Sequence, residues 1–167
     1  MLKSVSGGAL RKEDLDREVT LAGWVHRRRD HGGLIFLDLR DWEGIVQVVF
    51  NPEVAPQAHS MAQSLRSEWV LRIKGKVGQR PSGTVNSNIP TGEVEVMAQK
   101  LEVLNPSKTP PFSVEEEAAE ADELLRLKYR YLDLRRASLR DNLILRHRVV
   151  KFIRDFLSER GFIEVET

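Results

Sequence analysis

The sequence contains no cysteine among its 167 residues. This absence excludes a disulfide framework and any metal site built from thiolates. The four histidines are scattered through the chain without the short spacings that zinc ligands show. We therefore predict no metal-binding residues in this chain.

Long apolar runs are also missing. No segment approaches the ~18 consecutive apolar residues of a membrane-spanning helix, and the N-terminus, MLKSVSGGALRKEDLDREV, lacks the apolar centre of a secretory signal. The formal net charge is only +1, so the overall composition does not by itself indicate a nucleic-acid partner. Because 41% of the residues are hydrophobic, the chain can form a core, and we expect a cytoplasmic protein with no membrane partner.

Apolar and polar residues alternate in the N-terminal part of the chain, which is typical of β-strands. We predict five strands, with one helix at 53–67 between the third and the fourth; the strands span 19–25, 34–40, 44–50, 68–77 and 93–104. This order is that of an OB-fold, a five-stranded Greek-key barrel that binds oligonucleotides on the face of its second and third strands. The predicted fold class is therefore mainly β.

A segment rich in proline and carboxylates, NPSKTPPFSVEEEAAEADE, follows the last strand and is typical of a solvated linker. We therefore divide the chain into an OB-fold domain at 1–104, a linker at 105–123 and a second unit at 124–167.

The second unit is predicted to form a long helix at 137–162 followed by a strand. Ser138, with Asp141 three residues later, can cap the start of the helix, and Gly161 suits the left-handed residue that ends it. The strand would begin at Phe162 and would have no partner strand after it. We therefore expect this unit to be truncated.

One face of the predicted second and third strands could bind unpaired bases. Aliphatic residues at 35, 37 and 39 fill the core, so Phe36 points outward, and Gln47 of the third strand lies on the same outer surface. An aromatic ring beside an amide provides stacking and hydrogen bonding for a base. Alternatively, Phe36 covers an end of the barrel. Three arginines, Arg27 to Arg29, precede the turn before the second strand and would add positive charge, although they could also form a solvated strand end.

Glu95 in the fifth strand is expected to face outward as well. A carboxylate repels phosphate, but it can accept hydrogen bonds from the amino and imino groups of guanine. The alternative is an ordinary exposed strand glutamate. The sequence has neither a glycine-rich phosphate loop nor a Ser/His/Asp set, so we predict no catalytic residue and interpret the chain as a binding unit.

The sequence resembles the N-terminal part of bacterial-type aspartyl-tRNA synthetases, which are class II enzymes. The resemblance rests on LAGWVHRRRDHGGLIFLDLRDWEGIVQVVF, TGEVEV, LKYRYLDLRR and RGFIEVET. It implies that the barrel binds the tRNA anticodon, that Phe36 stacks on the middle base and that Gln47 hydrogen-bonds this base. It also implies that Glu95 reads the first base, a guanine, and that Arg29 contacts the anticodon.

The stretch RGFIEVET is similar to motif 1 of class II synthetases, which lies at the dimer interface. The resemblance implies a homodimeric full-length enzyme that uses ATP and Mg²⁺ to activate aspartate and transfer it to tRNA. The motifs that hold ATP are absent from this sequence, so we expect no cofactor and no ligase activity for the 167-residue chain alone.

His31 and Gly83 resemble the residues of the non-discriminating type of this family, which aspartylates the asparagine tRNA as well as the aspartate tRNA. Neutral variation in two loops is the alternative. Two other function classes also remain open at this point. One is a stand-alone OB-fold module for single-stranded nucleic acid, and the other is a dimerisation arm formed by residues 124–167.

Overall fold

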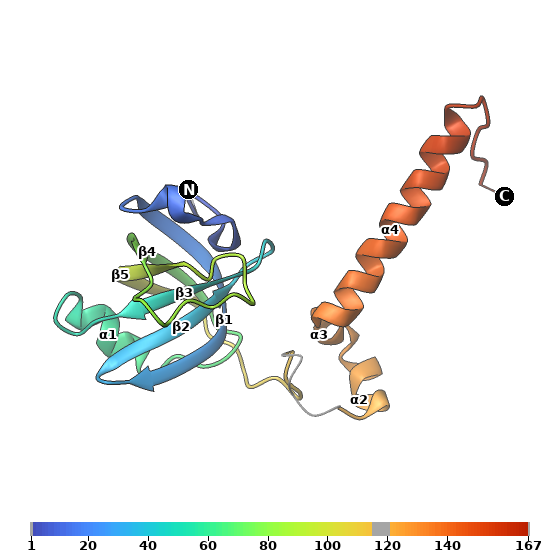
Figure 1. Ribbon diagram of the computed structural model, residues 1–167. Coiled ribbons are helices and arrows are strands. Elements are labelled where there is room, and N and C mark those ends of the chain that lie inside the picture. Colours follow the sequence, from blue (N-terminus) through green and yellow to red (C-terminus); the bar gives the residue numbers. More distant parts are fainter. Residues whose placement is uncertain (1, 115–120, 167) are drawn as a thin grey trace. The chain divides into compact units, whose positions relative to one another are not determined.

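A computed structural model describes residues 2–114 and 121–166. The chain divides into two compact units, Met1–Pro110 and Pro111–Thr167 (Figure 1). This division lies inside the segment that was predicted to be a linker. The first residues of the segment pack on the barrel, because the indole Nε1 of Trp69 donates a hydrogen bond of 3.0 Å to the Ser107 carbonyl oxygen.

The first unit is a closed five-stranded barrel with strand order β1-β2-β3-β5-β4. Only the pairing of β3 with β5 is parallel. The strands are β1 Glu18–His31, β2 Leu34–Arg40, β3 Ile45–Phe50, β4 Val70–Gln79 and β5 Val94–Asn105, with helix α1 at Pro56–Ala62 between β3 and β4. Two short 3-10 turns, η1 Gly7–Ala9 and η2 Lys12–Asp14, precede the barrel. The predicted OB-fold is confirmed.

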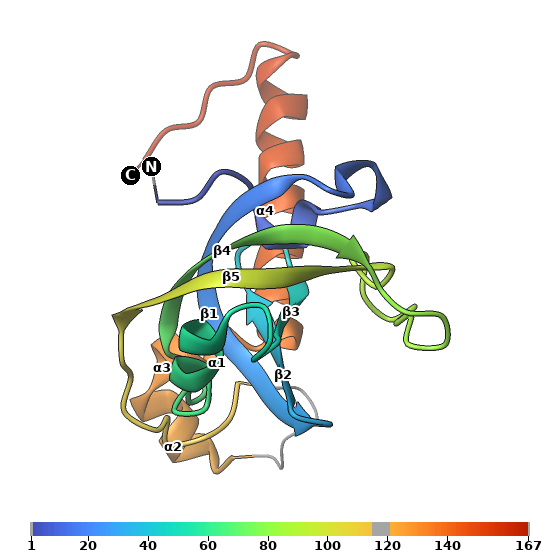
Figure 2. The same ribbon diagram turned by 90° about the vertical axis from the view of Figure 1, so that its left-hand side faces the viewer.

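Strand β1 is longer than predicted because it pairs with two neighbours in succession. Residues 18–24 pair with β4, and residues 24–31 pair with β2. A register shift between Val25 and Arg27 marks the change, and such a bulge bends a strand and increases its twist. Figure 2 shows the strong curvature of β1 around the barrel. The three arginines thus belong to the strand itself.

A two-residue turn joins β1 to β2. His31 pairs with Leu34, and Gly32 and Gly33 between them have φ angles of 60° and 80°. Two successive positive φ angles define the type I′ turn that suits the twist of a hairpin, and glycine adopts them without strain. The sequence DHGG therefore fixes the position of this hairpin tip.

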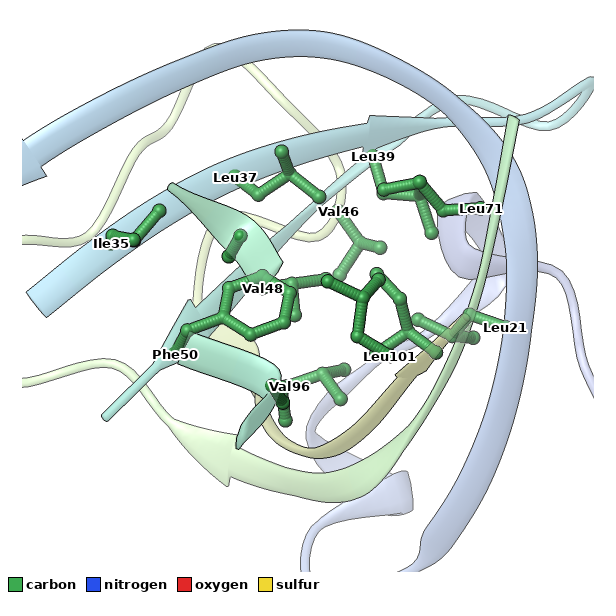
Figure 3. Close-up of a cluster of buried hydrophobic side chains, with 14 of the residues drawn as sticks. Leu21, Ile35, Leu37, Leu39, Val46, Val48, Phe50, Leu71, Val96 and Leu101 are labelled. Atoms are coloured by element: carbon green, nitrogen blue, oxygen red, sulfur yellow. The ribbon is translucent and has the colours of Figure 1, made fainter. Parts of the chain in front are cut away.

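The core lies inside the barrel, and every strand contributes to it. Alternate residues of β2 are buried as the sequence predicted, with Ile35, Leu37 and Leu39 each at most 2% exposed. Figure 3 shows these side chains packed with others from all five strands, among them Leu21, Val46, Val48, Phe50, Leu71, Val96 and Leu101. Ala58 and Ala62 of α1 join this cluster. The period-two pattern therefore predicted the buried face of β2 correctly.

The second unit contains α2 Glu123–Lys128, α3 Arg130–Asp133 and the long helix α4 Ala137–Ser158. The carboxylate of Asp133 is fully buried and accepts hydrogen bonds from Arg126 Nε at 3.0 Å and from Arg130 at 2.8 Å. Because these two arginines lie on α2 and α3, the buried carboxylate fixes one short helix against the other. This is the structural role of the stretch LKYRYLDLRR.

Three expectations for α4 can be compared with the structure. The predicted Ser138 cap is wrong: the helix begins at Ala137 after Arg136, without a side-chain capping hydrogen bond, and Ser138 lies inside its first turn. Gly161 has a φ of 83° just after the helix, as predicted. The predicted strand from Phe162 is wrong within the described residues, where 162–166 form no regular element. A strand needs a partner for its backbone hydrogen bonds, and none of the described residues pairs with this segment.

Candidate nucleic-acid interface

The outer face of β1, β2, β3 and β5 brings together the residues that the sequence singled out. In the strand register Arg29 lies opposite Phe36, Phe36 opposite Val49, and Val49 opposite Met97. Residues opposite one another in a sheet point to the same side. Phe36 is therefore placed between a cation and an apolar strip on the non-core side of the barrel.

The Phe36 side chain is half-buried and does not belong to the core cluster. This position agrees with the outward orientation that alternation predicted. An aromatic ring with one open side is suited to stacking on a base, because every base offers a π-face.

Gln47 and Glu95 lie on the same outer side, but they are not on an open surface. Only 7% of Gln47 and 8% of Glu95 is exposed, so the expectation of exposed side chains is corrected. Nε2 of Gln47 donates a hydrogen bond of 2.8 Å to Oε2 of Glu95. Both faces of β3 are buried from Val46 to Phe50, and Thr91 of the connection between β4 and β5 contacts the start of this strand, where its Oγ1 donates to the carbonyl oxygen of Ile45 at 2.6 Å. Alternation assigns a residue to one side of a sheet, but it does not say whether that side is open to water.

The environment of Glu95 favours its neutral form. Burial raises the pKa of the Glu95 carboxyl above its ordinary value, although the hydrogen bond from Gln47 and the positive charge of Arg80 act in the opposite direction. The hydrogen bond from Gln47 is made to Oε2 of this carboxylate and not to Oε1. One oxygen in a desolvated site is therefore available to accept N–H donors from a ligand.

Arg29 is held beside Gln47 by a residue to which the sequence analysis gave no role. One terminal nitrogen of its guanidinium lies 2.9 and 3.1 Å from the two carboxylate oxygens of Asp38 and 3.3 Å from Oε1 of Gln47. Alternation could have identified Asp38, because it lies two residues after Phe36 and so points to the same side of β2. The sequence did not show that Arg29 is the ion-pair partner of Asp38, because this depends on how β1 pairs with β2.

The other two arginines of the triplet lie elsewhere. Arg28 pairs with Leu37, whose side chain is in the core, and its guanidinium donates to the carbonyl oxygens of Ala62 and Gln63 at the end of α1. Arg27 is exposed and pairs with Asp38 across the strands. The expectation that all three arginines flank one platform is therefore wrong for Arg28, because neighbouring residues in a strand point to opposite sides.

Arg80 is a second charged residue that the sequence analysis missed. It follows β4, is 6% exposed and donates from Nε to the carbonyl oxygen of Val94 at 3.1 Å. Burial lowers the pKa of its guanidinium, and the charges of Glu95 and Asp38 oppose this effect. A buried cation thus stands close to the buried carboxylate.

His31 and Gly83 each lie close in the chain to a member of this cluster: His31 is two residues after Arg29 on β1, and Gly83 precedes Thr84, whose carbonyl oxygen accepts a hydrogen bond of 3.5 Å from Arg80. His31 is exposed at the end of β1 and lines a shallow pocket with Gly33, His59 and Gln63. Gly83 is exposed in the connection between β4 and β5, with a φ of 85°. Both predicted specificity residues are therefore exposed, one at a strand end and one in a loop.

Two further searches concern other classes of site. Within residues 2–114 and 121–166, no helix is long and apolar enough to cross a membrane. The same residues contain no group of three or more His, Cys, Asp or Glu side chains that could hold a metal ion.

Comparison with known proteins agrees with this architecture. The family model of the OB-fold nucleic acid binding domain matches residues 19–104, and the model of class II tRNA synthetases (D, K and N) matches residues 122–167. An aspartate–tRNA(Asp/Asn) ligase of Dehalococcoides mccartyi is 59% identical over all 167 residues, and the one of Syntrophomonas wolfei is 61% identical over 151 residues, or 90% of this chain. The matched regions cover 28% and 26% of those two proteins.

The asparaginyl-tRNA synthetase of Pyrococcus horikoshii is a similar solved structure, with a TM-score of 0.84 at 29% identity. The match covers 99% of this chain and 38% of that protein. The chain thus spans less than a third of the length of the two ligases described above. The family model that matches more than half of the sequence decides the family: the chain belongs to the OB-fold nucleic acid binding domains, and its residues 122–167 are similar to the class II tRNA synthetases of the D, K and N type.

Proposed function

We propose that the barrel binds the anticodon of a tRNA as part of a longer aspartate–tRNA ligase. The observation that carries this proposal is the cluster on the outer face, where the half-buried ring of Phe36 lies near a hydrogen-bonded amide and carboxylate, Gln47 and Glu95. A stacking ring, an amide and a carboxylate are the groups that an unpaired base requires. The similarity of the whole chain to aspartate–tRNA(Asp/Asn) ligases supports the same conclusion.

Each residue has a distinct role in this proposal. Phe36 stacks on the middle base of the anticodon, which contributes ~1–3 kcal/mol to binding. Gln47 forms a hydrogen bond with this base. Glu95 accepts hydrogen bonds from the imino and amino groups of a guanine through its available oxygen, and Arg29 supplies positive charge beside them. We assign no catalytic role to any residue of this chain.

Binding of guanine would act against the effect of burial on Glu95. The raised pKa reflects the lack of solvation for the negative charge. Two N–H donors from guanine stabilise the ionised carboxylate, so the ligand replaces the water that the protein excludes. A base without these donors leaves a buried charge poorly solvated, and the site therefore rejects it.

The longer enzyme would activate aspartate with ATP and Mg²⁺, transfer it to tRNA in the cytoplasm and act as a homodimer. Helix α4 supports the dimer, because large apolar side chains on it are exposed, among them Leu145, Phe152 and Phe156 at 61%, 67% and 43%. Sedimentation of the chain with and without residues 124–167 tests this part. Equal association of both forms would argue against a contribution of α4.

We further propose that the enzyme accepts both the aspartate and the asparagine tRNA. The support is the pair His31 and Gly83, together with the names of the two bacterial relatives, aspartate–tRNA(Asp/Asn) ligases, which include both tRNAs. A lysine in place of Gly83 would add a long, charged side chain, so the glycine at this exposed position relaxes selection at the third anticodon base, where the two tRNAs differ. The stand-alone binding module is less favoured, because residues 122–167 match a synthetase family.

Binding of three anticodon stem-loops, for aspartate, asparagine and an unrelated amino acid, tests the proposal. We expect similar affinity for the first two and at least tenfold weaker binding of the third, about the contribution of one good base contact. Equal affinity for all three stem-loops would exclude anticodon recognition. Binding of the aspartate stem-loop alone would leave anticodon recognition intact but exclude the relaxed specificity.

A further inference from the structure

Asp38 is the central carboxylate of the outer face. It lies on β2 opposite Gln47 of β3 on one side and opposite Arg27 of β1 on the other. Both of its oxygens accept hydrogen bonds from one nitrogen of Arg29, at 2.9 and 3.1 Å. The Asp38 side chain is 17% exposed and that of Arg29 is 47% exposed, so the carboxylate lies deeper than the guanidinium.

This pair determines how the Gln47 amide is oriented. The same Arg29 nitrogen lies 3.3 Å from Oε1 of Gln47, and Nε2 of Gln47 donates to Glu95. Charges of opposite sign thus flank the amide, and they allow only one of its two orientations. Asp38 holds the cation in place, and the cation together with Glu95 fixes the amide.

An arginine on a nucleic-acid surface also has an unselective use. A free guanidinium binds any phosphate, and such contacts provide affinity without sequence information. A guanidinium that is already paired with a carboxylate gains less from a phosphate, because the existing ion pair has to be broken first. The Asp38 charge additionally repels the backbone of an RNA that makes no base contacts.

We propose that Asp38 is a positioning residue that makes the outer face selective for bases rather than for backbone charge. It restrains Arg29 against Gln47 and lowers the affinity for RNA that lacks the matching bases. This inference rests on the proposed function, because it assumes that the cluster on the outer face is where the anticodon binds. It differs from a purely stabilising cross-strand ion pair, which would not influence the preference among RNAs.

The test compares Asp38→Asn with Glu102→Gln in the full 167-residue chain. Glu102 pairs across the strands with Arg72, on β5 and β4, so its substitution also frees a strand arginine, but away from the cluster. Binding of the aspartate stem-loop and of an unrelated stem-loop is measured at several salt concentrations. Circular dichroism confirms that each variant is folded.

For Asp38→Asn we expect tighter binding of the unrelated stem-loop and a preference for the aspartate stem-loop that is reduced about tenfold, the size of one charge-assisted hydrogen bond. The salt dependence steepens by about 0.7 in log K against log salt, because one more phosphate is neutralised. Glu102→Gln should leave the preference unchanged. An unchanged preference in Asp38→Asn, or an equal loss of affinity for both stem-loops, would overturn the proposal.

A second comparison tests whether Asp38 acts through Arg29. If Asp38 acts through Arg29, adding Asp38→Asn to Arg29→Gln should leave binding of the unrelated stem-loop unchanged within twofold. A further rise in affinity in the double variant would overturn the inference. If the unsubstituted chain shows no preference, the proposed function fails, and the salt dependence of Asp38→Asn still tests the restraint on Arg29.

Discussion

Gln47 donates a hydrogen bond of 2.8 Å from Nε2 to Oε2 of Glu95, and these two polar side chains are only 7% and 8% exposed. The bond connects β3 to β5, the one parallel pair in the barrel. Burial of the ionised Glu95 carboxylate destabilises the free protein, because the charge has lost its hydration. Hydrogen bonds from a ligand would offset this loss. The pair therefore links the stability of the free protein to its proposed ligand.

The first prediction concerns pH. The pKa of Glu95 is raised in the folded chain, so the unfolded chain releases this proton at lower pH than the folded chain does. Between the ordinary pKa of glutamate and the raised value, the Glu95 contribution to the free energy of unfolding therefore decreases as pH rises. Glu95→Gln removes this contribution, and urea unfolding of both proteins from acidic to neutral pH measures the difference.

The carboxyl group of Asp14 contributes to the pH dependence of stability with the opposite sign. The pKa of Asp14 is lowered, chiefly by the backbone hydrogen bond from Arg11, so its contribution is lost as pH falls. The difference between the unsubstituted chain and Glu95→Gln isolates the one group of interest. Parallel pH profiles of the two proteins would show that the pKa of Glu95 is not raised in the folded chain.

Glu95→Gln should also weaken binding of the aspartate stem-loop by about 1.5–3 kcal/mol, the value of hydrogen bonds to a charged group.

The second prediction concerns stacking. Phe36→Ala should weaken binding of the aspartate stem-loop by ~1–3 kcal/mol, because one base loses its aromatic partner. Trp42→Ala is the matched control, since Trp42 is an aromatic residue that is 76% exposed between β2 and β3. Fluorescence anisotropy with labelled stem-loops measures both variants. A similar loss in the two variants would argue against a specific role of Phe36.

The third prediction concerns an ion pair that supports the barrel outside the interface. Both oxygens of Glu68 accept hydrogen bonds of 2.8 Å from Arg40, and only 4% of the Glu68 side chain is exposed. Glu68→Gln leaves the buried guanidinium without its counter-charge, so we expect a loss of about 3–5 kcal/mol in the free energy of unfolding.

The exposed pair of Arg72 and Glu102 serves as the control. Its side chains are 42% and 52% exposed, so Glu102→Gln should change the free energy of unfolding by less than about 1 kcal/mol. Urea unfolding monitored by circular dichroism distinguishes the two expectations. If both variants lost the same free energy of unfolding, the buried pair of Arg40 and Glu68 would contribute no more to stability than the exposed pair.

The fourth prediction concerns the specificity positions. Gly83 has a φ of 85°, and no atom lies within 4 Å of where a Cβ would be, so strain rather than crowding opposes a side chain. Gly83→Ala and Gly83→Lys should each destabilise the chain by about 1 kcal/mol. His31→Leu combined with Gly83→Lys should abolish binding of the asparagine stem-loop and keep that of the aspartate stem-loop.

Gly83→Ala separates the backbone effect from the side-chain effect. It introduces the same strain without the charge and length of lysine, so both stem-loops should still bind. Loss of asparagine binding in Gly83→Ala alone would assign the effect to the loop conformation. Titration of both stem-loops against the three proteins gives the answer.

Much of the barrel could be predicted because local chemistry determined it. Period-two alternation identified the core residues of β2, and the residues Gly32 and Gly33 fixed the tip of the first hairpin through their positive φ angles. The bounds of β2 agree residue for residue with the prediction, and those of β5 within one residue at each end. These features depend on residues that are close together in the sequence, so they can be predicted without knowledge of the tertiary structure.

The limits of β1 and the environment of the polar residues could not be predicted in this way. Strand β1 continues from Trp24 along a second partner, β2, with a bulge between Val25 and Arg27, and both faces of β3 are buried, so that Gln47 is buried as well. The start of α4 also differed, because Ser138 suited a cap that the structure does not use. In each case the outcome depends on which distant segment lies alongside.

By itself the sequence determined the order of the strands, the side of the sheet on which Phe36, Gln47 and Glu95 lie, and the apolar residues of the core. Only the tertiary structure decided that Arg29 is paired with Asp38, that Arg28 turns to α1, and that Glu95 is buried beside Arg80. The physical reason is that alternation is a local property of an extended chain. Pairing, burial and the resulting pKa depend on contacts between strands that are far apart in the sequence.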